Sequence, residues 1–104
     1  MQIKILNSTL EQFIQSLEKR TIAKVLRTID LLERFGHELG MPHSKKIRAS
    51  LFELRVRGQQ EVRIFYTFQR NAVVLLHGFI KKSQRIPERG LNTAEQKLAS
   101  LDKT

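Results

Sequence analysis

The stretch LFELRVRGQQEVRIFYTFQRNAVVLLHGFIKK, residues 51–82, decides the fold. Apolar and polar side chains alternate over residues 51–57 and again over residues 62–68. This period of two points successive side chains to opposite faces of a sheet. The polar interruptions GQQ at 58–60 and RN at 70–71 are typical of turns. The stretch therefore predicts an antiparallel meander of three strands.

The third strand of this meander, residues 73–80, is apolar at every position except His77 and Gly78. A strand with apolar side chains on both faces is typical of the middle of a sheet that is covered on both sides. By the alternation, we expect His77 to share a face with Phe79, opposite to Leu76.

The residues before the meander predict a strand followed by helices. Residues 2–6, QIKIL, alternate apolar and polar side chains and suit a short edge strand. The pattern STLE, which begins at Ser8, is typical of a capping box in which Glu11 reaches back to the start of the helix. Apolar residues then recur every three or four positions as far as Phe35. This predicts two helices joined near residues 19–21, or one long kinked helix.

The remaining segments complete the expected order of elements. Gly36 is expected to end the helical region as a C-terminal cap. Residues 37–50 contain Gly40 and Pro42 and show no clean period, so they predict a loop. Pro87 suits the first turn of a last helix, whose apolar stripe consists of Leu91, Ala94, Leu98 and Leu101.

The length and composition fit a single domain over residues 1–104, with 40% hydrophobic and 28% charged residues. The predicted fold class is α+β. An N-terminal strand, an α-hairpin and a C-terminal helix pack on one face of an antiparallel sheet. No cysteine is present, which excludes disulfides and thiolate nucleophiles. The longest apolar run is too short to span a membrane and no signal peptide is visible, so we expect a cytoplasmic protein.

Positive charge is concentrated in the middle of the chain. The formal net charge is +9, and residues 41–90 carry 11 Lys and Arg against 3 Asp and Glu, whereas residues 1–40 carry 6 against 5. Such a surface favours nucleic acid, an acidic protein or an anionic membrane as its partner. The alternative is a solvated basic surface that binds no partner.

Several segments together resemble a known family. LFELRVR, EVRIFYTF and VVLLHGFIKKSQRIP follow a helical hairpin and the loop LGMPHSKK. In this combination they resemble the RelE/ParE superfamily of bacterial toxins, most closely its HigB-like, phage-derived branch. The resemblance covers nearly the whole chain, and LLHGFIKK is its most specific part. It implies a RelE-like fold whose meander forms a cradle for RNA.

The resemblance also implies a function and a partner. It implies the toxin of a type II toxin–antitoxin system, acting as a metal-independent endoribonuclease that cuts messenger RNA, usually on the translating ribosome. The partner would be a cognate antitoxin, HigA-like and with a helix-turn-helix domain, and no cofactor or membrane is implied. Two alternatives stay open, namely a ParE-like toxin that acts on DNA gyrase without cleavage and a non-toxic nucleic-acid-binding module.

Metal-free RNA cleavage needs in-line positioning of the 2′-hydroxyl, positive charge around the phosphate, and proton transfer. Arg63 is expected to clamp the transition state, because a guanidinium can hold two phosphate oxygens, and it matches the strand arginine of the RelE motif. Arg55 matches a basic residue on the preceding strand and is a second catalytic candidate, while Arg57 beside it is expected to bind RNA. The alternative is an exposed cross-strand ion pair with Glu53 or Glu61.

Lysines supply the rest of the expected charge. Lys81 and Lys82 match a basic pair that RelE members carry after the last strand, and we expect one of them to act at the scissile phosphate. A lysine is a base at neutral pH only where neighbouring cations lower its pKa. The alternative is a solvated strand end. RNA contacts are also expected from Arg85, Lys45 and Lys46.

His77 is the only histidine inside a predicted strand, and imidazole is the best proton shuttle near neutral pH. It is therefore a catalytic candidate, with a hydrogen-bonded structural role as the alternative. His43 is expected to contact RNA. No histidine has carboxylates at metal-ligand spacing, so no metal site is predicted. Several RelE-type toxins use a tyrosine near the C-terminus, but Tyr66 is the only tyrosine here, which leaves the general base to a histidine or a lysine.

Aromatic side chains are expected to hold splayed bases at the cleavage site. By the alternation, Phe65 and Phe79 are the candidates, whereas Phe52, Tyr66 and Phe68 are expected to fill the core.

Overall fold

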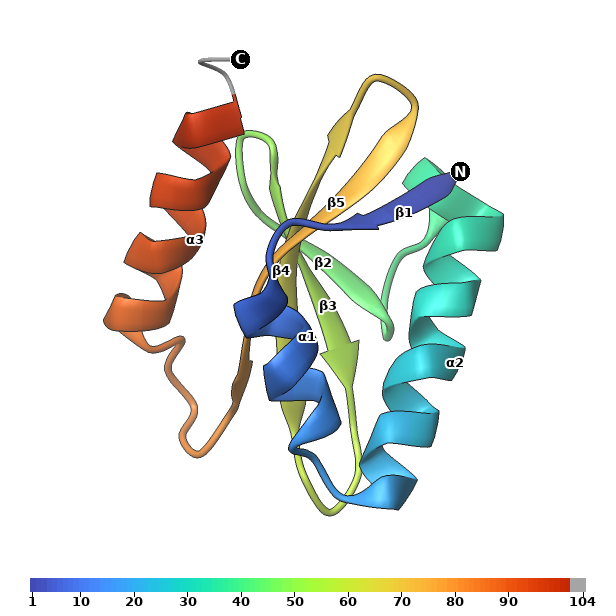
Figure 1. Ribbon diagram of the computed structural model, residues 1–104, viewed down its shortest axis with the longest axis vertical. Coiled ribbons are helices and arrows are strands. Elements are labelled where there is room, and N and C mark those ends of the chain that lie inside the picture. Colours follow the sequence, from blue (N-terminus) through green and yellow to red (C-terminus); the bar gives the residue numbers. More distant parts are fainter. Residues whose placement is uncertain (102–104) are drawn as a thin grey trace.

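The computed structural model describes residues 1–101 and shows an α+β fold built on one five-stranded sheet. The strand order is β1-β5-β4-β3-β2, with the longest strand, β5, next to the N-terminal one (Figure 1). The elements in chain order are β1 (Gln2–Ile5), α1 (Ser8–Gln15), α2 (Lys19–Phe35), η1 (Gly36–Glu38), β2 (Ser44–Arg48), β3 (Leu51–Val56), β4 (Val62–Gln69), β5 (Ala72–Ile80) and α3 (Glu88–Leu101).

The meander is confirmed, but the sheet is mixed. β3 pairs antiparallel with β4, and β4 pairs antiparallel with β5, as the alternation predicts. β1 instead runs parallel to β5, with Ile3 opposite Val73. A fully antiparallel sheet was therefore a wrong prediction. Alternating side chains identify a strand, but they carry no information about the direction of its neighbour.

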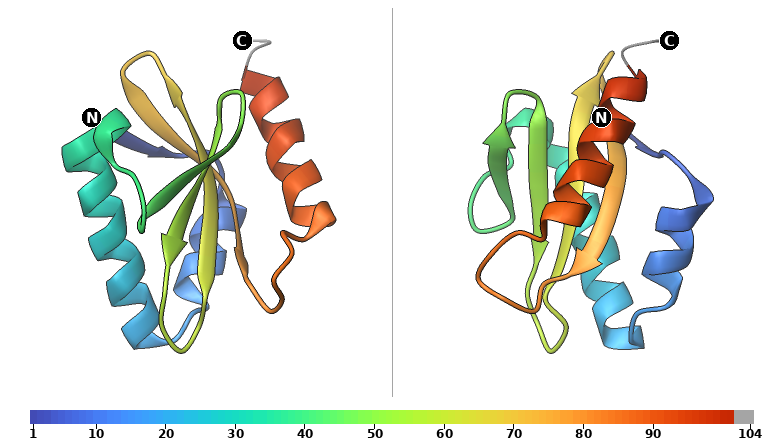
Figure 2. Two further views of the ribbon diagram at one scale, coloured as in Figure 1. Left: turned by 180° about the vertical axis from the view of Figure 1, so that it is seen from behind. Right: turned by 90° about the vertical axis from the view of Figure 1, so that its left-hand side faces the viewer.

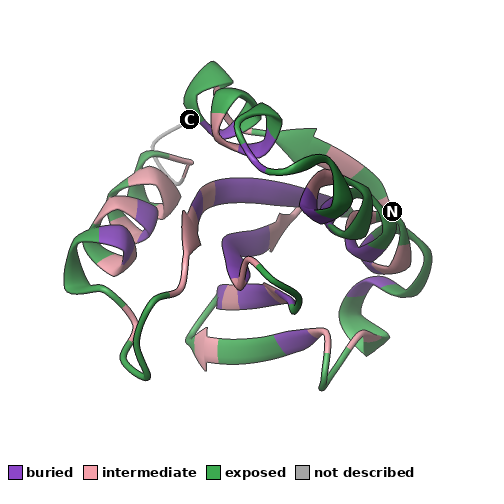
Figure 3. Ribbon diagram, turned by 90° about the horizontal axis from the view of Figure 1, so that it is seen from below, coloured by how far each residue is buried: buried purple, intermediate pink, exposed green. Residues whose placement is uncertain are grey.

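An additional strand, β2, occupies part of the segment that the sequence predicts to be a loop. It pairs antiparallel with β3, and its register shifts between Lys46 and Arg48. Most of its side chains are exposed, as expected for a sheet edge, and the shift interrupts the alternation (Figure 3). The sequence of β2 consequently lacks the alternation of apolar and polar residues that identifies a strand. The lysines at this exposed edge also discourage pairing with another chain.

The helical hairpin is confirmed, with corrections at its ends. α1 begins after Asn7, whose side-chain oxygen accepts a hydrogen bond from the Leu10 N–H at 3.1 Å, so Asn7 and not Ser8 is the N-cap. α1 and α2 are separate helices joined just before Lys19. Gly36 ends α2 with a φ of +53°, a conformation that glycine adopts without strain.

Helices cover both faces of the sheet, so the expectation that all of them lie on one face was wrong (Figure 2). Side chains of α1 and α2 pack against one face around Leu54, Ile64 and Leu75, which are fully buried. α3 packs against the other face, where Phe65 and Leu76 are fully buried. Each such side chain stabilises the fold by roughly 1.5–3 kcal/mol. β5 lies between the two layers, which confirms that it is covered on both sides.

An irregularity in β5 changes the direction of its side chains. Phe65 of β4 lies opposite His77, but Tyr66 lies opposite Leu75, so β5 contains one extra residue at this point. Leu76 consequently packs in the α3 layer together with Phe79. The prediction that Leu76 points away from Phe79 was wrong, because simple alternation does not hold across a bulge.

No helix within residues 1–101 is long and apolar enough to cross a membrane.

Candidate active site

A polar cavity of about 600 Å³ lies where the β3–β4 hairpin meets the segment after β5. We call it the cradle. Its lining residues come from β3, from the β3–β4 connection, from the start of β4 and from residues 81–84. They are Arg55, Arg57, Glu61, Arg63, Lys81, Lys82, Ser83 and Gln84. The structure thus brings together both predicted lysines and all three predicted strand arginines.

Strand register determines where these side chains meet. Arg55 and Arg63 are direct partners across β3 and β4, and the Lys81 N–H donates to the Glu61 carbonyl at 2.6 Å. Arg63 lies on the same face of β4 as Phe65, which packs under α3. α3 therefore covers one part of this sheet face, and the cradle occupies the part near the β3–β4 turn.

Arg63 is buried, with an exposed fraction of only 2%. Its Nη1 lies 3.2 Å from Glu61 Oε2 and donates to the Val62 carbonyl at 3.1 Å, while its Nε lies 3.8 Å from Glu53 Oε1. The alternative of an exposed ion pair is therefore wrong for Arg63, because this side chain is buried. Its expected partners, Glu53 and Glu61, do lie beside it. These contacts hold the guanidinium in one orientation at the base of the cradle.

Glu53 lies between two arginines. Its Oε1 is 3.7 Å from Arg55 Nε and 3.8 Å from Arg63 Nε, and its side chain is 5% exposed. Both Nε groups are buried without a hydrogen-bond partner. One carboxylate thus faces two guanidinium groups, and Glu61 also faces Arg63, so the excess of positive charge in the cradle comes from Arg57, Lys81 and Lys82. Such an excess attracts a phosphate group.

The rim of the cradle is more accessible than its base. Lys82, Arg57 and Gln84 are exposed, and Lys81 is half-buried. Lysine and arginine side chains at such positions can move toward a bound phosphate at little cost. Arg85 is also exposed but does not line the cavity, so its expected RNA contact stays a prediction.

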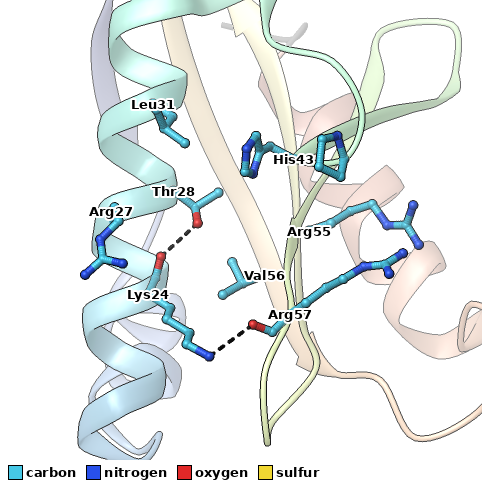
Figure 4. A pocket seen from close by; sticks show the side chains of 9 residues that line it. Lys24, Arg27, Thr28, Leu31, His43, Arg55, Val56 and Arg57 are labelled. Atoms are coloured by element: carbon cyan, nitrogen blue, oxygen red, sulfur yellow. Dashed lines mark hydrogen bonds between the residues drawn. The ribbon is translucent and has the colours of Figure 1, made fainter.

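A second cavity of about 310 Å³ adjoins the cradle on the other side of β3. Figure 4 shows that Val56 points toward α2 into this cavity, whereas the guanidinium groups of Arg55 and Arg57 extend away from α2. The Lys24 ammonium lies 3.5 Å from the Arg57 carbonyl. His43 lines this second cavity and not the cradle, so its expected contact with RNA stays a prediction.

His77 does not line the cradle. It lies beneath α3, where a side chain at Gly90 would come within 3.6 Å of the imidazole. Burial lowers the pKa of His77, and the nearby Lys97 ammonium lowers that pKa further. Lys97 itself donates to the Leu76 carbonyl at 3.0 Å. His77 therefore lies apart from the cradle, and both its catalytic role and its structural alternative stay predictions.

The other predicted RNA-contacting residues lie apart from the cavity. Lys45 and Lys46 are exposed on β2 and do not line the cradle. Phe65 is fully buried, and its ring packs against that of Phe79 with centroids 5.5 Å apart. The prediction that Phe65 faces RNA was wrong, because alternation indicates a face of the sheet but does not show that α3 covers it. Phe79 is half-buried in the same layer.

Tyr66 lies in the core, as predicted. It is 1% exposed, and its hydroxyl forms a hydrogen bond with Ser44. Burial raises the pKa of Tyr66. Tyr66 therefore lies away from the cradle and is not a candidate for its general base.

The sequence interpretation missed Glu61, Ser83 and Gln84 as lining residues and treated Glu53 and Glu61 only as exposed partners of the arginines. Glu61 precedes β4, where the period of two already places it on the Arg63 side, and this signal could have identified it. Within residues 1–101, no three His, Asp or Glu side chains gather as metal ligands would.

Comparisons with known proteins place the chain in a family. The model of the family described as phage derived protein Gp49-like (DUF891) matches residues 12–99. The fold is similar to that of a chain in the heterotetrameric YoeB–YefM toxin–antitoxin complex from Staphylococcus aureus, with a TM-score of 0.54 and 16% sequence identity. This likeness covers 72% of this chain and 90% of that chain. It confirms the RelE-like fold class. Curated proteins yielded no match. Because the family model spans most of its length, this chain belongs to the phage-derived Gp49-like family.

Proposed function

We propose that this protein is the toxin of a type II toxin–antitoxin system and a metal-independent endoribonuclease that cleaves messenger RNA on the translating ribosome. The observation that carries this proposal is the cradle, in which three arginines and two lysines from separate segments line one cavity. A cavity with this lining is suited to a phosphate of an RNA chain. These residues are far apart in the sequence, and the fold brings them together.

The roles of the cationic residues follow from their exposure. Arg63 is held rigidly and is suited to stabilise negative charge as it develops on the phosphate, because a fixed donor needs no rearrangement during the reaction. Arg55 lies opposite Arg63 and adds charge to the same base of the cradle. The rim residues Lys82 and Arg57 are suited to bind the RNA chain and to neutralise the leaving oxygen.

The comparisons support an antitoxin as the partner. The similar chain belongs to a complex that is described as a toxin–antitoxin pair. A HigA-like antitoxin with a helix-turn-helix domain fits the HigB-like resemblance of the sequence. The cradle carries excess positive charge, so an antitoxin segment with acidic side chains would complement it.

A second candidate function is a ParE-like toxin that acts on DNA gyrase without cleaving RNA. The burial of Arg63 between carboxylates favours this function, because an arginine that only stabilises the fold would have the same contacts. The exposed lysines and Arg57 favour RNA cleavage, since a structural role does not account for cations that line a cavity together.

Controlled expression in a bacterial host followed by mapping of messenger RNA ends tests the proposal. New 5′ ends at a fixed position within codons are expected for the native protein. Lys82→Ala is expected to reduce cleavage by roughly 10²–10³-fold, since it removes a charge at the reacting phosphate. Lys82 is exposed, so this variant should fold normally, and Lys19→Ala on α2 is a matched control away from the cradle.

Three results would reject RNase activity or its location. Growth arrest with intact messenger RNA and a DNA damage response would favour action on gyrase. If controlled expression of the native protein does not arrest growth, the proposal that the protein is a toxin is rejected. Full cleavage by both Lys82→Ala and Arg63→Lys, with both proteins folded, would show that the cradle is not the active site.

A further inference from the structure

Glu61 is the only carboxylate among the residues that line the cradle. We propose that it is the general base that removes the proton from the attacking 2′-hydroxyl of RNA, an inference that rests on the proposed RNase function. Its side chain is 40% exposed, and its Oε2 lies 3.2 Å from Arg63 Nη1. The carboxylate therefore reaches the cavity while remaining attached to the residue that would hold the phosphate.

The composition of the cradle leaves no other acceptor for this proton among the lining residues. Arginine and lysine side chains already carry their proton at neutral pH, and serine hydroxyls and glutamine amides are very weak bases. The histidine considered from the sequence, His77, lies beneath α3 and does not line the cavity. A carboxylate is ionised at neutral pH and can accept a proton in the transition state.

Backbone and side-chain contacts hold Glu61 in place. Its carbonyl accepts the Lys81 N–H at 2.6 Å, which ties the residue before β4 to the residue after β5. Its Oε2 faces Arg63, so Oε1 is the oxygen that can turn toward a 2′-hydroxyl. A phosphate bound at Arg63 would then place the adjacent ribose next to the base, because one guanidinium contacts both groups.

The reaction balances with groups that are present in the cradle. The Glu61 carboxylate takes the 2′-hydroxyl proton as the 2′-oxygen attacks the adjacent phosphorus. The bond from phosphorus to the 5′-oxygen breaks, and this oxygen takes a proton from the ammonium of Lys82 or Lys81. The products are a 2′,3′-cyclic phosphate and a 5′-hydroxyl. Proton exchange with water then restores the carboxylate and the ammonium.

The same contact with Arg63 could instead occupy the phosphate site in the free protein, and the two roles predict opposite results. A base is required for cleavage, so its removal slows the reaction. A carboxylate that merely competes with phosphate for Arg63 inhibits the reaction, so its removal speeds cleavage and strengthens RNA binding. Glu61→Gln distinguishes these roles because it keeps the size of the side chain and removes its charge.

The experiment measures single-turnover cleavage of a messenger RNA, both free and on programmed ribosomes, by the full-length protein. Glu61→Gln is expected to cleave about 10²–10⁴-fold more slowly than the native protein. Glu61→Asp is expected to recover part of this loss. RNA binding, measured with a substrate that carries 2′-deoxyribose at the cleavage site, should be at least as tight in Glu61→Gln. Glu88→Gln, at an exposed position of α3 outside the cradle, is the matched control and should cleave at the native rate.

Two further readouts separate a base from a structural residue. Glu61→Gln should change the dependence of the cleavage rate on pH relative to the native protein, whereas the loss of a residue with a purely structural role would leave that dependence unchanged. A substrate with sulfur in place of the leaving 5′-oxygen needs no protonation of the leaving group. It should rescue Lys82→Ala but not Glu61→Gln.

The outcomes separate the two proposals. If the native protein cleaves RNA and Glu61→Gln cleaves as fast or faster, Glu61 is not the base, while the RNase function stands. If sulfur substitution rescues Glu61→Gln, the residue acts on the leaving group and the assignment as a base is overturned. If the native protein cleaves neither free nor ribosome-bound RNA, the proposed function is rejected and the role of Glu61 with it.

Discussion

Glu53 and Arg63 form a buried pair across β3 and β4, with Oε1 of the carboxylate 3.8 Å from Nε of the guanidinium. Their exposed fractions are 4% and 2%. Arg55 approaches the same Oε1 at 3.7 Å. Burying charged groups costs free energy unless opposite charges lie beside them. Glu53 therefore makes it possible to hold two guanidinium groups at the base of the cradle.

Glu53→Gln is expected to lower the free energy of unfolding by about 3 kcal/mol, because it leaves two largely buried guanidinium groups without the carboxylate between them. Urea denaturation monitored by circular dichroism measures the change. Glu88→Gln makes the same chemical change at an exposed position in the first turn of α3, and the lost charge–dipole interaction should cost no more than about 1 kcal/mol. Equal stability of the two variants would show that Glu53 does not compensate the buried arginines.

The stability of the protein should depend on the protonation of His77. Burial, and secondarily Lys97, lower its pKa in the folded state below the ordinary value of 6.5. The unfolded chain therefore binds the proton more readily, so His77 destabilises the fold as pH falls below about 6.5 toward its folded-state pKa. The free energy of unfolding should be higher at pH 7.5 than at pH 5.0, and His77→Gln should narrow this difference.

The same measurement on Lys97→Met tests the contribution of the Lys97 ammonium to the pKa of His77. This substitution removes the smaller of the two causes of the lowered pKa, so it should narrow the difference between pH 7.5 and pH 5.0 less than His77→Gln does. Carboxylates elsewhere contribute equally to the pH dependence of the native protein, His77→Gln and Lys97→Met, so their contribution cancels in the comparison. If the free energy of unfolding of His77→Gln depends on pH as strongly as that of the native protein, stability does not depend on the protonation of His77.

Gly78 allows α1 to approach β5 closely. A Cβ atom at this position would lie 2.7 Å from Phe13 Cε2 and 3.1 Å from Leu10 Cδ1, which is closer than packed atoms allow. Gly78→Ala should therefore destabilise the protein by about 1–3 kcal/mol, measured by thermal or urea unfolding. Gly40→Ala is the matched control, because no atom lies within 4 Å of the added group. If Gly78→Ala is as stable as Gly40→Ala, α1 can move away from β5 at little cost.

The alternation over residues 51–80 was sufficient to predict the meander, its two turns and the strand arginines. Apolar spacing and Gly36 were sufficient for the helical hairpin and its end. These patterns are local, since side chains two or four positions apart already report which face they occupy. The cluster of cations was also predictable, because the meander brings Arg55, Arg63 and the lysines toward one end of the sheet whatever the details of packing.

Long-range contacts decided the rest. The parallel pairing of β1, the edge strand β2 and the bulge before His77 depend on partners that are distant in the chain. The placement of α3 against the second face of the sheet buried Phe65 and kept His77 apart from the cradle.

The sequence by itself determined which residues carry the positive charge and which strands present them. Only the tertiary structure decided that Arg63 is buried between Glu53 and Glu61. The physical reason is that alternation gives the direction of a side chain, whereas its burial and its charged neighbours depend on which elements pack over it.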